Sequence, residues 1–140
     1  MKTICMALVA VLLAACANTN EPEGVGSAQV LEGSWRIAEV GSQSIPMQGS
    51  AIKMLRFETE ASKFSGNAGC NRLFGLYEQE AAQLRFNGIA TTRMACDPVS
   101  MQLERKVIDH MENVQTWQVV GDELRLLDSS NHTVLKLKRM

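Results

Sequence analysis

Histidines, aromatic residues and long apolar runs are all scarce in this chain. Its 140 residues include two histidines, four phenylalanines, two tryptophans and one tyrosine. The longest apolar run, Ile4 to Ala15, has about a dozen residues, whereas a membrane-spanning helix needs about 20. Basic residues do not outnumber acidic ones, 14 against 15, although a basic surface is the usual footprint of nucleic-acid binding. These shortages argue against a membrane-spanning helix and against a nucleic-acid partner.

The residues that usually carry catalysis have no recognisable setting. His110 and His132 lie outside any motif, and no G-x-S-x-G nucleophile elbow occurs. The long gap between Cys70 and Cys96 fits no zinc-ligand spacing, and no glycine-rich phosphate loop precedes a helix. The methionines are scattered, which is typical of gap-filling core residues rather than of copper ligands. We therefore expect no enzymatic activity, no cofactor and no metal.

The N-terminus has the three parts of an export signal. Lys2 supplies a positive charge, the apolar run follows, and Leu13-Ala14-Ala15-Cys16 ends it with small residues. These four residues resemble the lipobox of bacterial lipoproteins. We predict a signal peptide over residues 1–15 and lipidation of Cys16. The alternative is an ordinary secretory signal with a chance cysteine at its end.

Lipidation would place the mature chain in the cell envelope, with the membrane as a partner through the anchor at Cys16. Residues 16–30 are small and polar and include a proline and two glycines, which predicts a flexible tether ahead of a domain over residues 31–140. Ala17 stands where an aspartate commonly retains lipoproteins at the inner membrane. We therefore predict an outer-membrane anchor facing the periplasm.

Two cysteines remain in the folded part, Cys70 and Cys96. In an oxidising compartment two such leftover thiols usually pair. In the chain-entropy model, closing the loop between them stabilises the fold by about 3.5 kcal/mol. We predict a Cys70–Cys96 disulfide, and the alternative is two buried thiols kept apart.

Short apolar segments separated by turn residues predict an α+β domain. We expect strands at Trp35–Val40, Ile52–Phe57, Lys63–Gly66, Leu73–Tyr77, Leu84–Phe86, Thr116–Val120, Glu123–Leu127 and Thr133–Leu137. The predicted architecture is a mostly antiparallel curled sheet or partial barrel with one covering helix.

The covering helix is predicted to follow Asp97 and Pro98, which suit a helix cap and a first helical position. It should run for about 14 residues with Glu104 on its polar face. Its apolar stripe is expected to comprise Val99, Leu103, Val107, Met111 and Val114.

Two stretches resemble signatures of the META-domain family. Phe64 to Tyr77, FSGNAGCNRLFGLY, is similar to G-x-x-G-C-N-x-x-x-G-x-Y, and Ile89 to Cys96, IATTRMAC, is similar to T-x-M-A-C. The resemblance covers residues 31–140, with one departure at Leu73, where the family often has phenylalanine. Within the family, the chain resembles the HslJ-like lipoproteins of Gram-negative bacteria. It implies a META fold in the envelope and links to heat stress and novobiocin resistance, without an established biochemical activity or catalytic residues.

The motif positions have a structural interpretation and a binding alternative. The glycines should supply positive φ or close strand approach, and the asparagine should satisfy neighbouring backbone groups. Phe74 and the motif tyrosine should point to opposite faces of a regular strand. The positions singled out are Gly66, Gly69, Asn71, Gly75, Tyr77, Thr91, Met94 and Glu104.

The leading functional hypothesis is a non-enzymatic, monomeric envelope lipoprotein. It would act in heat-stress or novobiocin-type antibiotic tolerance by binding a protein of the envelope, a peptide or a small molecule. The alternative is a periplasmic inhibitor of lysozyme or another hydrolase, which would present the Gly66–Asn71 or Ser129–His132 turn to an enzyme cleft. A third hypothesis is a structural accessory subunit of an envelope complex.

Overall fold

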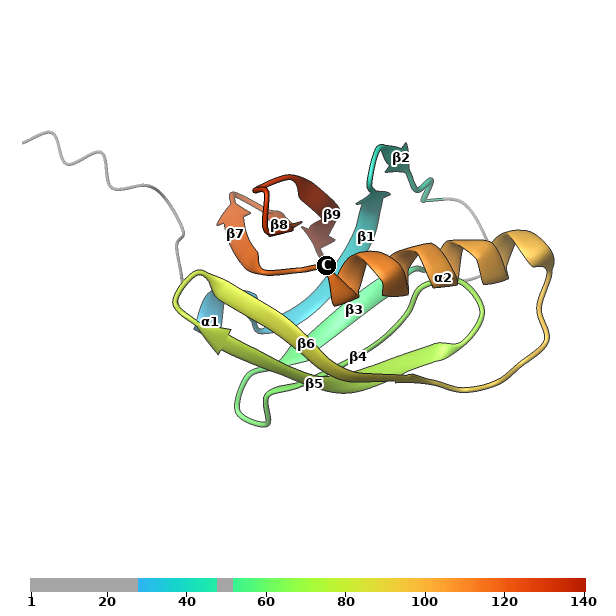
Figure 1. Ribbon diagram of the computed structural model, residues 1–140, viewed down its shortest axis with the longest axis horizontal. Coiled ribbons are helices and arrows are strands. Elements are labelled where there is room, and N and C mark those ends of the chain that lie inside the picture. The colour runs from blue at the N-terminus through green and yellow to red at the C-terminus, as the bar shows by residue number, and fades with distance from the viewer. Residues whose placement is uncertain (1–27, 48–51) are drawn as a thin grey trace, which may run out of the picture.

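The computed structural model describes residues 28–47 and 52–140 (Figure 1). The predicted signal peptide, Cys16 and residues 16–27 of the predicted tether lie outside the described residues. Among the described helices, none is long and apolar enough to cross a membrane. The elements in chain order are α1 (Ala28–Leu31), β1 (Gly33–Val40), β2 (Gln43–Ser44), β3 (Met54–Glu58), β4 (Lys63–Asn67), β5 (Arg72–Glu80), β6 (Gln83–Thr91), α2 (Pro98–Glu112), β7 (Thr116–Val120), β8 (Glu123–Leu127) and β9 (Thr133–Arg139).

The strands form one antiparallel sheet that curls into a ring. Its order is β2-β1-β3-β4-β5-β6-β7-β8-β9, and β1 also pairs with β9, which brings the two ends of the sheet together. The narrowest junction is between β6 and β7, where Gln83 pairs with Thr116 alone. This confirms the predicted α+β class and the mostly antiparallel curled sheet with one covering helix.

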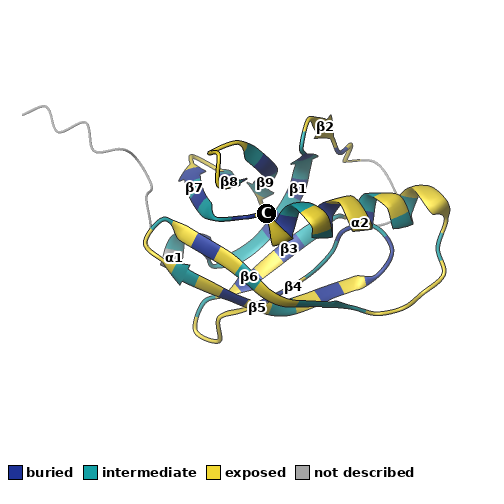
Figure 2. Ribbon diagram, viewed as in Figure 1, coloured by how far each residue is buried: buried dark blue, intermediate teal, exposed yellow. Residues whose placement is uncertain are grey.

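The core lies inside the ring because alternate strand residues point inward. Figure 2 shows this alternation of buried and exposed residues along β5. Trp35 and Trp117 are almost wholly buried, and both indole N–H groups find a carbonyl partner, Leu31 at 2.8 Å and Ala81 at 3.0 Å. Burial of each large apolar side chain contributes about 1.5–3 kcal/mol. The interior side chains therefore hold the ring together.

Helix α2 lies across the opening between β6 and the β1–β9 pair (Figure 1). Asp97 caps it as predicted, accepting a hydrogen bond from the Ser100 backbone N–H at 2.9 Å, and Pro98 opens its first turn. The hydrogen bond from Ser100 holds the pKa of Asp97 below its ordinary value.

Three details of the predicted helix are wrong. Val99 is 75 % exposed instead of contributing to the apolar stripe, and Glu104 is buried instead of lying on the polar face. Residues four apart on a helix drift by about 40°, whereas residues seven apart differ by only about 20°. Val99 therefore rotates away from the sheet, while Glu104 shares the face of Met111. The predicted stripe also included Val114, which is buried but lies beyond the end of the helix.

Candidate functional site

The buried carboxylate of Glu104 is the centre of a polar cluster beneath the β4–β5 connection. Its Oε2 accepts hydrogen bonds from the backbone N–H groups of Cys70, at 3.1 Å, and Asn71. Its Oε1 accepts one from the Asn71 side-chain amide at 2.8 Å. The side chain thus satisfies three donors at a place where two chain segments meet. We call Cys70, Asn71, Thr92, Met94 and Glu104 the motif cluster.

Asn71 connects the two signature stretches. Its side-chain oxygen accepts hydrogen bonds from the Met94 backbone N–H at 2.7 Å and from the Thr92 hydroxyl at 3.1 Å. The Thr92 hydroxyl in turn accepts from the Arg72 backbone N–H at 3.1 Å. Asn71 therefore satisfies backbone groups as expected. The threonine hydroxyl in this network belongs to Thr92, the residue after the predicted Thr91. Met94 takes part through its backbone N–H, while its side chain is 53 % exposed.

The predicted disulfide is present in the structure. Cys70 and Cys96 are bonded, with their Cα atoms 5.8 Å apart. The bond joins the β4–β5 connection, at Cys70, to Cys96, the residue just before the Asp97 cap of α2. The disulfide and the motif cluster therefore fix the same corner of the domain, one covalently and the other through hydrogen bonds.

The three motif glycines provide close approach rather than positive φ. A Cβ atom on Gly66 would collide with the Met54 carbonyl oxygen, and one on Gly69 would collide with that of Ser100 in α2. A Cβ atom on Gly75 would lie 2.7 Å from Cε1 of Phe64. The sequence allowed either role. In the structure these positions need glycine because neighbouring segments leave no room for a Cβ atom.

A bulge in β6 was not predicted. The pairing with β5 shifts register between Phe74 and Leu76, which leaves an extra residue on β6. Gly88 lies in that extra stretch and has φ of 60°, a conformation that glycine adopts at little cost.

Tyr77 points into the core, whereas Phe74 points outward as expected for the opposite face of the strand. The Tyr77 ring packs edge-on against Phe57, with centroids 5.4 Å apart. Its hydroxyl is buried and has no hydrogen-bond partner among the described residues. Burial, together with the nearby Glu32 carboxylate, raises the pKa of Tyr77 to about 12.

The motif cluster is suited to holding chain segments together. The side-chain oxygens of Asn71 and Glu104 accept hydrogen bonds from inside the protein, and both residues are less than a tenth exposed. Within residues 28–47 and 52–140, no group of three or more His, Cys, Asp or Glu side chains is placed to hold a metal ion. The polar groups of the motif cluster therefore form hydrogen bonds within the protein.

A different surface, on the outside of the ring, exposes apolar side chains. Phe74 separates two hollows there, one of about 580 Å³ and one of about 380 Å³. The larger hollow is lined by apolar side chains and flanked by two arginines. We call this surface the outer apolar face and define it by Ile52, Met54, Arg56, Arg72, Phe74 and Leu76.

Sequence reasoning missed the outer apolar face, although β5 carries a signal for it. Leu73 and Tyr77 point inward and are buried, while Phe74 and Leu76 between them are 47 % and 52 % exposed. A strand with one solvated face normally alternates apolar and polar residues. The strand β5 instead carries apolar side chains on both faces.

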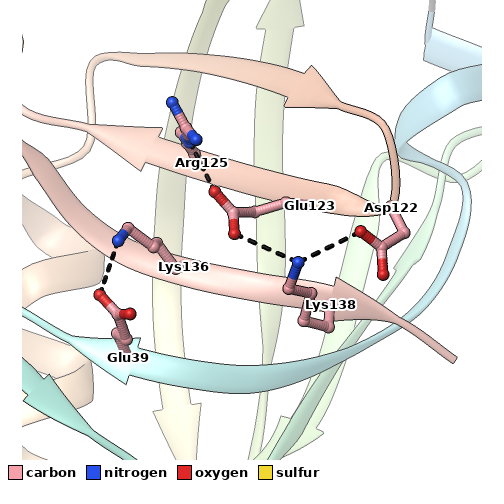
Figure 3. Close-up of polar contacts among 6 residues, drawn as sticks. All are labelled: Glu39, Asp122, Glu123, Arg125, Lys136 and Lys138. Atoms are coloured by element: carbon pink, nitrogen blue, oxygen red, sulfur yellow. Dashed lines mark hydrogen bonds and ion pairs between the residues drawn. The ribbon is translucent and has the colours of Figure 1, made fainter.

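The opposite side of the ring carries a network of ion pairs, drawn in Figure 3. Lys136 lies 2.8 Å from Glu39, joining β9 to β1. Lys138 lies 3.1 Å from Asp122 and 3.3 Å from Glu123. Glu123 also accepts a hydrogen bond from Arg125 at 2.6 Å, and this bond is the main reason that the pKa of Glu123 is lowered. We call these six residues the ion-paired face.

Comparison with known proteins identifies the sequence family and the fold. A family model described as META domain matches residues 28–140. No curated protein matches the chain significantly. The chain is similar to a Burkholderia xenovorans protein solved by NMR, with 21 % identity, a TM-score of 0.66, and coverage of 93 % of this chain and 99 % of that one.

Two further solved structures share the fold. One is another protein solved by NMR, with 19 % identity and a TM-score of 0.64, covering 80 % of this chain and 93 % of that one. The other is a DUF4847 family protein from Bacteroides vulgatus, with 12 % identity and a TM-score of 0.58, covering 79 % of this chain and 94 % of that one. At these identities the likeness concerns the fold alone.

Proposed function

The chain belongs to the META-domain family, and on that premise we propose that it is a non-enzymatic envelope lipoprotein that supports heat-stress or novobiocin-type antibiotic tolerance by binding a partner. The lipobox-like Leu13-Ala14-Ala15-Cys16 supports export and an acyl anchor on Cys16. Ala17 supports transfer to the outer membrane.

The observation that carries the binding role is the outer apolar face. Ile52, Phe74 and Leu76 are each about half exposed and adjoin the two hollows. Contiguous exposed apolar surface commonly marks an interaction site, because water contacts it at a free-energy cost that a partner removes. The motif cluster, in contrast, has its polar atoms engaged internally. We therefore place partner binding on the outer apolar face.

Complementation of a deletion strain tests the binding role. Loss of the gene should increase sensitivity to heat and to novobiocin, and the wild-type gene should restore tolerance. The variant with Phe74→Thr and Leu76→Thr should reach the envelope in normal amounts but fail to restore tolerance. Val120→Thr is the matched control, because Val120 is 44 % exposed on β7, away from this face. Full tolerance with the double variant would reject the assignment of function to this face.

Mass spectrometry and fractionation test the anchor separately. The mature protein should begin at Cys16 with acyl groups attached and should sediment with the outer membrane. An unmodified Cys16, or recovery in the inner-membrane fraction, would contradict the corresponding part of the proposal.

A second candidate function, inhibition of a hydrolase such as lysozyme, is favoured by one exposed turn. Asp128 organises this turn, Ser129–His132, by accepting hydrogen bonds from the backbone N–H groups of Ser130, at 2.8 Å, and His132, at 2.9 Å. The bond from His132 is the main reason that the pKa of Asp128 is lowered. In the other turn considered from the sequence, Gly66–Asn71, every residue is buried or half-buried next to the motif cluster. Undiminished lysis by lysozyme at a molar excess of the protein would reject inhibition.

A further inference from the structure

We infer that the outer apolar face docks on the anionic headgroups of the bilayer that carries the acyl anchor, so that the domain lies against the membrane surface. This inference rests on the proposed function because it takes the acyl chains on Cys16 as the attachment. It identifies the partner of the outer apolar face as an anionic lipid surface.

The apolar part of the face has the composition of an interfacial membrane contact. Phe74 stands between the two hollows, with Ile52 on one side and Leu76 on the other. All three side chains remain about half exposed in the folded domain. Aromatic and aliphatic side chains in such positions enter the boundary between headgroups and acyl chains, where they leave water.

The charged part of the face selects anionic headgroups. Arg56 and Arg72 flank the larger hollow, and none of the described residues that line it is acidic. Arg72 has no ion pair among the described residues, and Arg56 makes a single contact of 3.7 Å with the half-exposed Glu58. Lys63 and Glu58 line the smaller hollow from opposite positions on β4 and β3, so this part of the face is balanced in charge and the excess positive charge lies at the larger hollow. Arg56 and Arg72 are therefore available to phosphate groups, and each Arg near an anionic membrane surface favours binding.

The ion-paired face shows why this orientation is preferred over its opposite. Lys136, Lys138 and Arg125 already contact carboxylates, so approaching headgroups would compete with those acids. That face therefore attracts an anionic bilayer less strongly than the outer apolar face does.

The length of chain between anchor and domain permits the contact. The 12 residues from Cys16 to the start of α1 reach at most about 40 Å when extended. The five residues of β5 from Arg72 to Leu76, which run along the face, cover about 17 Å. Tethering also keeps the domain at a high effective concentration next to the lipid, so that a weak contact suffices.

Vesicle binding by the non-acylated protein tests the inference apart from the anchor. The whole mature chain, residues 16–140 with Cys16→Ser, is mixed with vesicles of phosphatidylethanolamine and phosphatidylglycerol or with vesicles of phosphatidylcholine alone. We expect binding to the anionic vesicles only, decreasing as salt rises. The variant with Arg56→Gln and Arg72→Gln should bind about 30-fold more weakly. The matched control, with Arg125→Gln and Lys136→Gln, removes the same charge from the ion-paired face and should bind within about twofold of wild type.

A second variant separates apolar contact from charge. The Phe74→Thr and Leu76→Thr variant should also lose most of its vesicle binding while its thermal unfolding stays close to that of wild type. Absence of binding, equal binding to both vesicle types, or an equal loss in the matched control would overturn the inference. A stable dimer that uses this face and ignores vesicles would overturn it too, in favour of a second copy as occupant. Each of these results leaves the acyl anchor and the tolerance phenotype to be decided by their own tests.

Discussion

The motif cluster and the outer apolar face lie close together where β5 begins, at Asn71 and Arg72, but use their side chains in opposite ways. At the corner, Asn71 and Glu104 direct their polar atoms inward and engage them in hydrogen bonds. On the outer face, Phe74 and Leu76 present apolar groups to water. The residues at the fixed positions of the signature hold the fold together, while residues at its variable positions supply the surface available to a partner. Changes at the corner should therefore affect stability, and changes on the face should affect binding.

Glu104→Ala should have the largest effect on stability. It leaves two backbone N–H groups and the Asn71 amide without their buried acceptor. We expect a loss of about 3–5 kcal/mol in the free energy of unfolding, measured by urea denaturation. Glu104→Gln should lose less, because one acceptor oxygen is kept. Glu112→Gln in the exposed last turn is the control, and a similarly small change at Glu104 would contradict the role given to the cluster.

Removal of the disulfide should have the second-largest effect on the free energy of unfolding. Replacing Cys70 and Cys96 together by alanine frees a loop closed over a separation of 26 residues. The chain-entropy model predicts a loss of about 3.5 kcal/mol. The same urea titration measures it, and reduction of the wild-type protein with dithiothreitol should reproduce the shift. Equal stability of the oxidised and reduced proteins would show that hydrogen bonds alone hold the corner.

Tyr77 should make stability fall at high pH. Its folded pKa is raised to about 12 from an ordinary value near 10, so the unfolded chain loses its proton first as the pH rises. The free energy of unfolding therefore keeps its full value below about pH 10. It falls by about 2 kcal/mol as the pH rises towards 12. In Tyr77→Phe this part of the decline should vanish, and stability at pH 7 should not fall, because the hydroxyl has no partner among the described residues. Unfolding curves for both proteins from pH 7 to 12 measure the effect; parallel declines would contradict it.

Substitutions on the outer face should change stability least. Phe74→Thr with Leu76→Thr removes half-exposed side chains and introduces threonine, which is itself common in strands. The free energy of unfolding should therefore shift by at most about 0.5 kcal/mol. A loss above about 2 kcal/mol would mean that these side chains serve the fold, and the contrast with the corner would disappear.

Local patterns in the sequence predicted most elements of the fold. Alternation located the strands, and Asp97 with Pro98 located the start of α2. Closure of the ring by β1 and β9 could not be read in this way, since it joins residues about one hundred positions apart and depends on how the whole sheet curls. The β6 bulge at Gly88 likewise depends on the register of two strands rather than on one segment.

The candidate site was predicted less completely than the fold. The positions of Asn71 and Glu104 came from resemblance, but the hydrogen bonds between them did not. A spacing of seven residues from Glu104 to Met111 would have placed the carboxylate on the buried face. The outer apolar face could not be predicted from the signature, because Phe74 and Leu76 stand at its variable positions; their alternation with buried residues on β5 is the signal that marks them.

Relaxation of methyl resonances by a spin-labelled lipid tests the central claim most directly, in acylated protein anchored in vesicles that contain phosphatidylglycerol. The outer apolar face should lie at the headgroups, so the methyl signals of Ile52 and Leu76 should broaden strongly while that of Val120 stays sharp. Equal broadening at all three residues, or sharp signals at Ile52 and Leu76, would contradict the account.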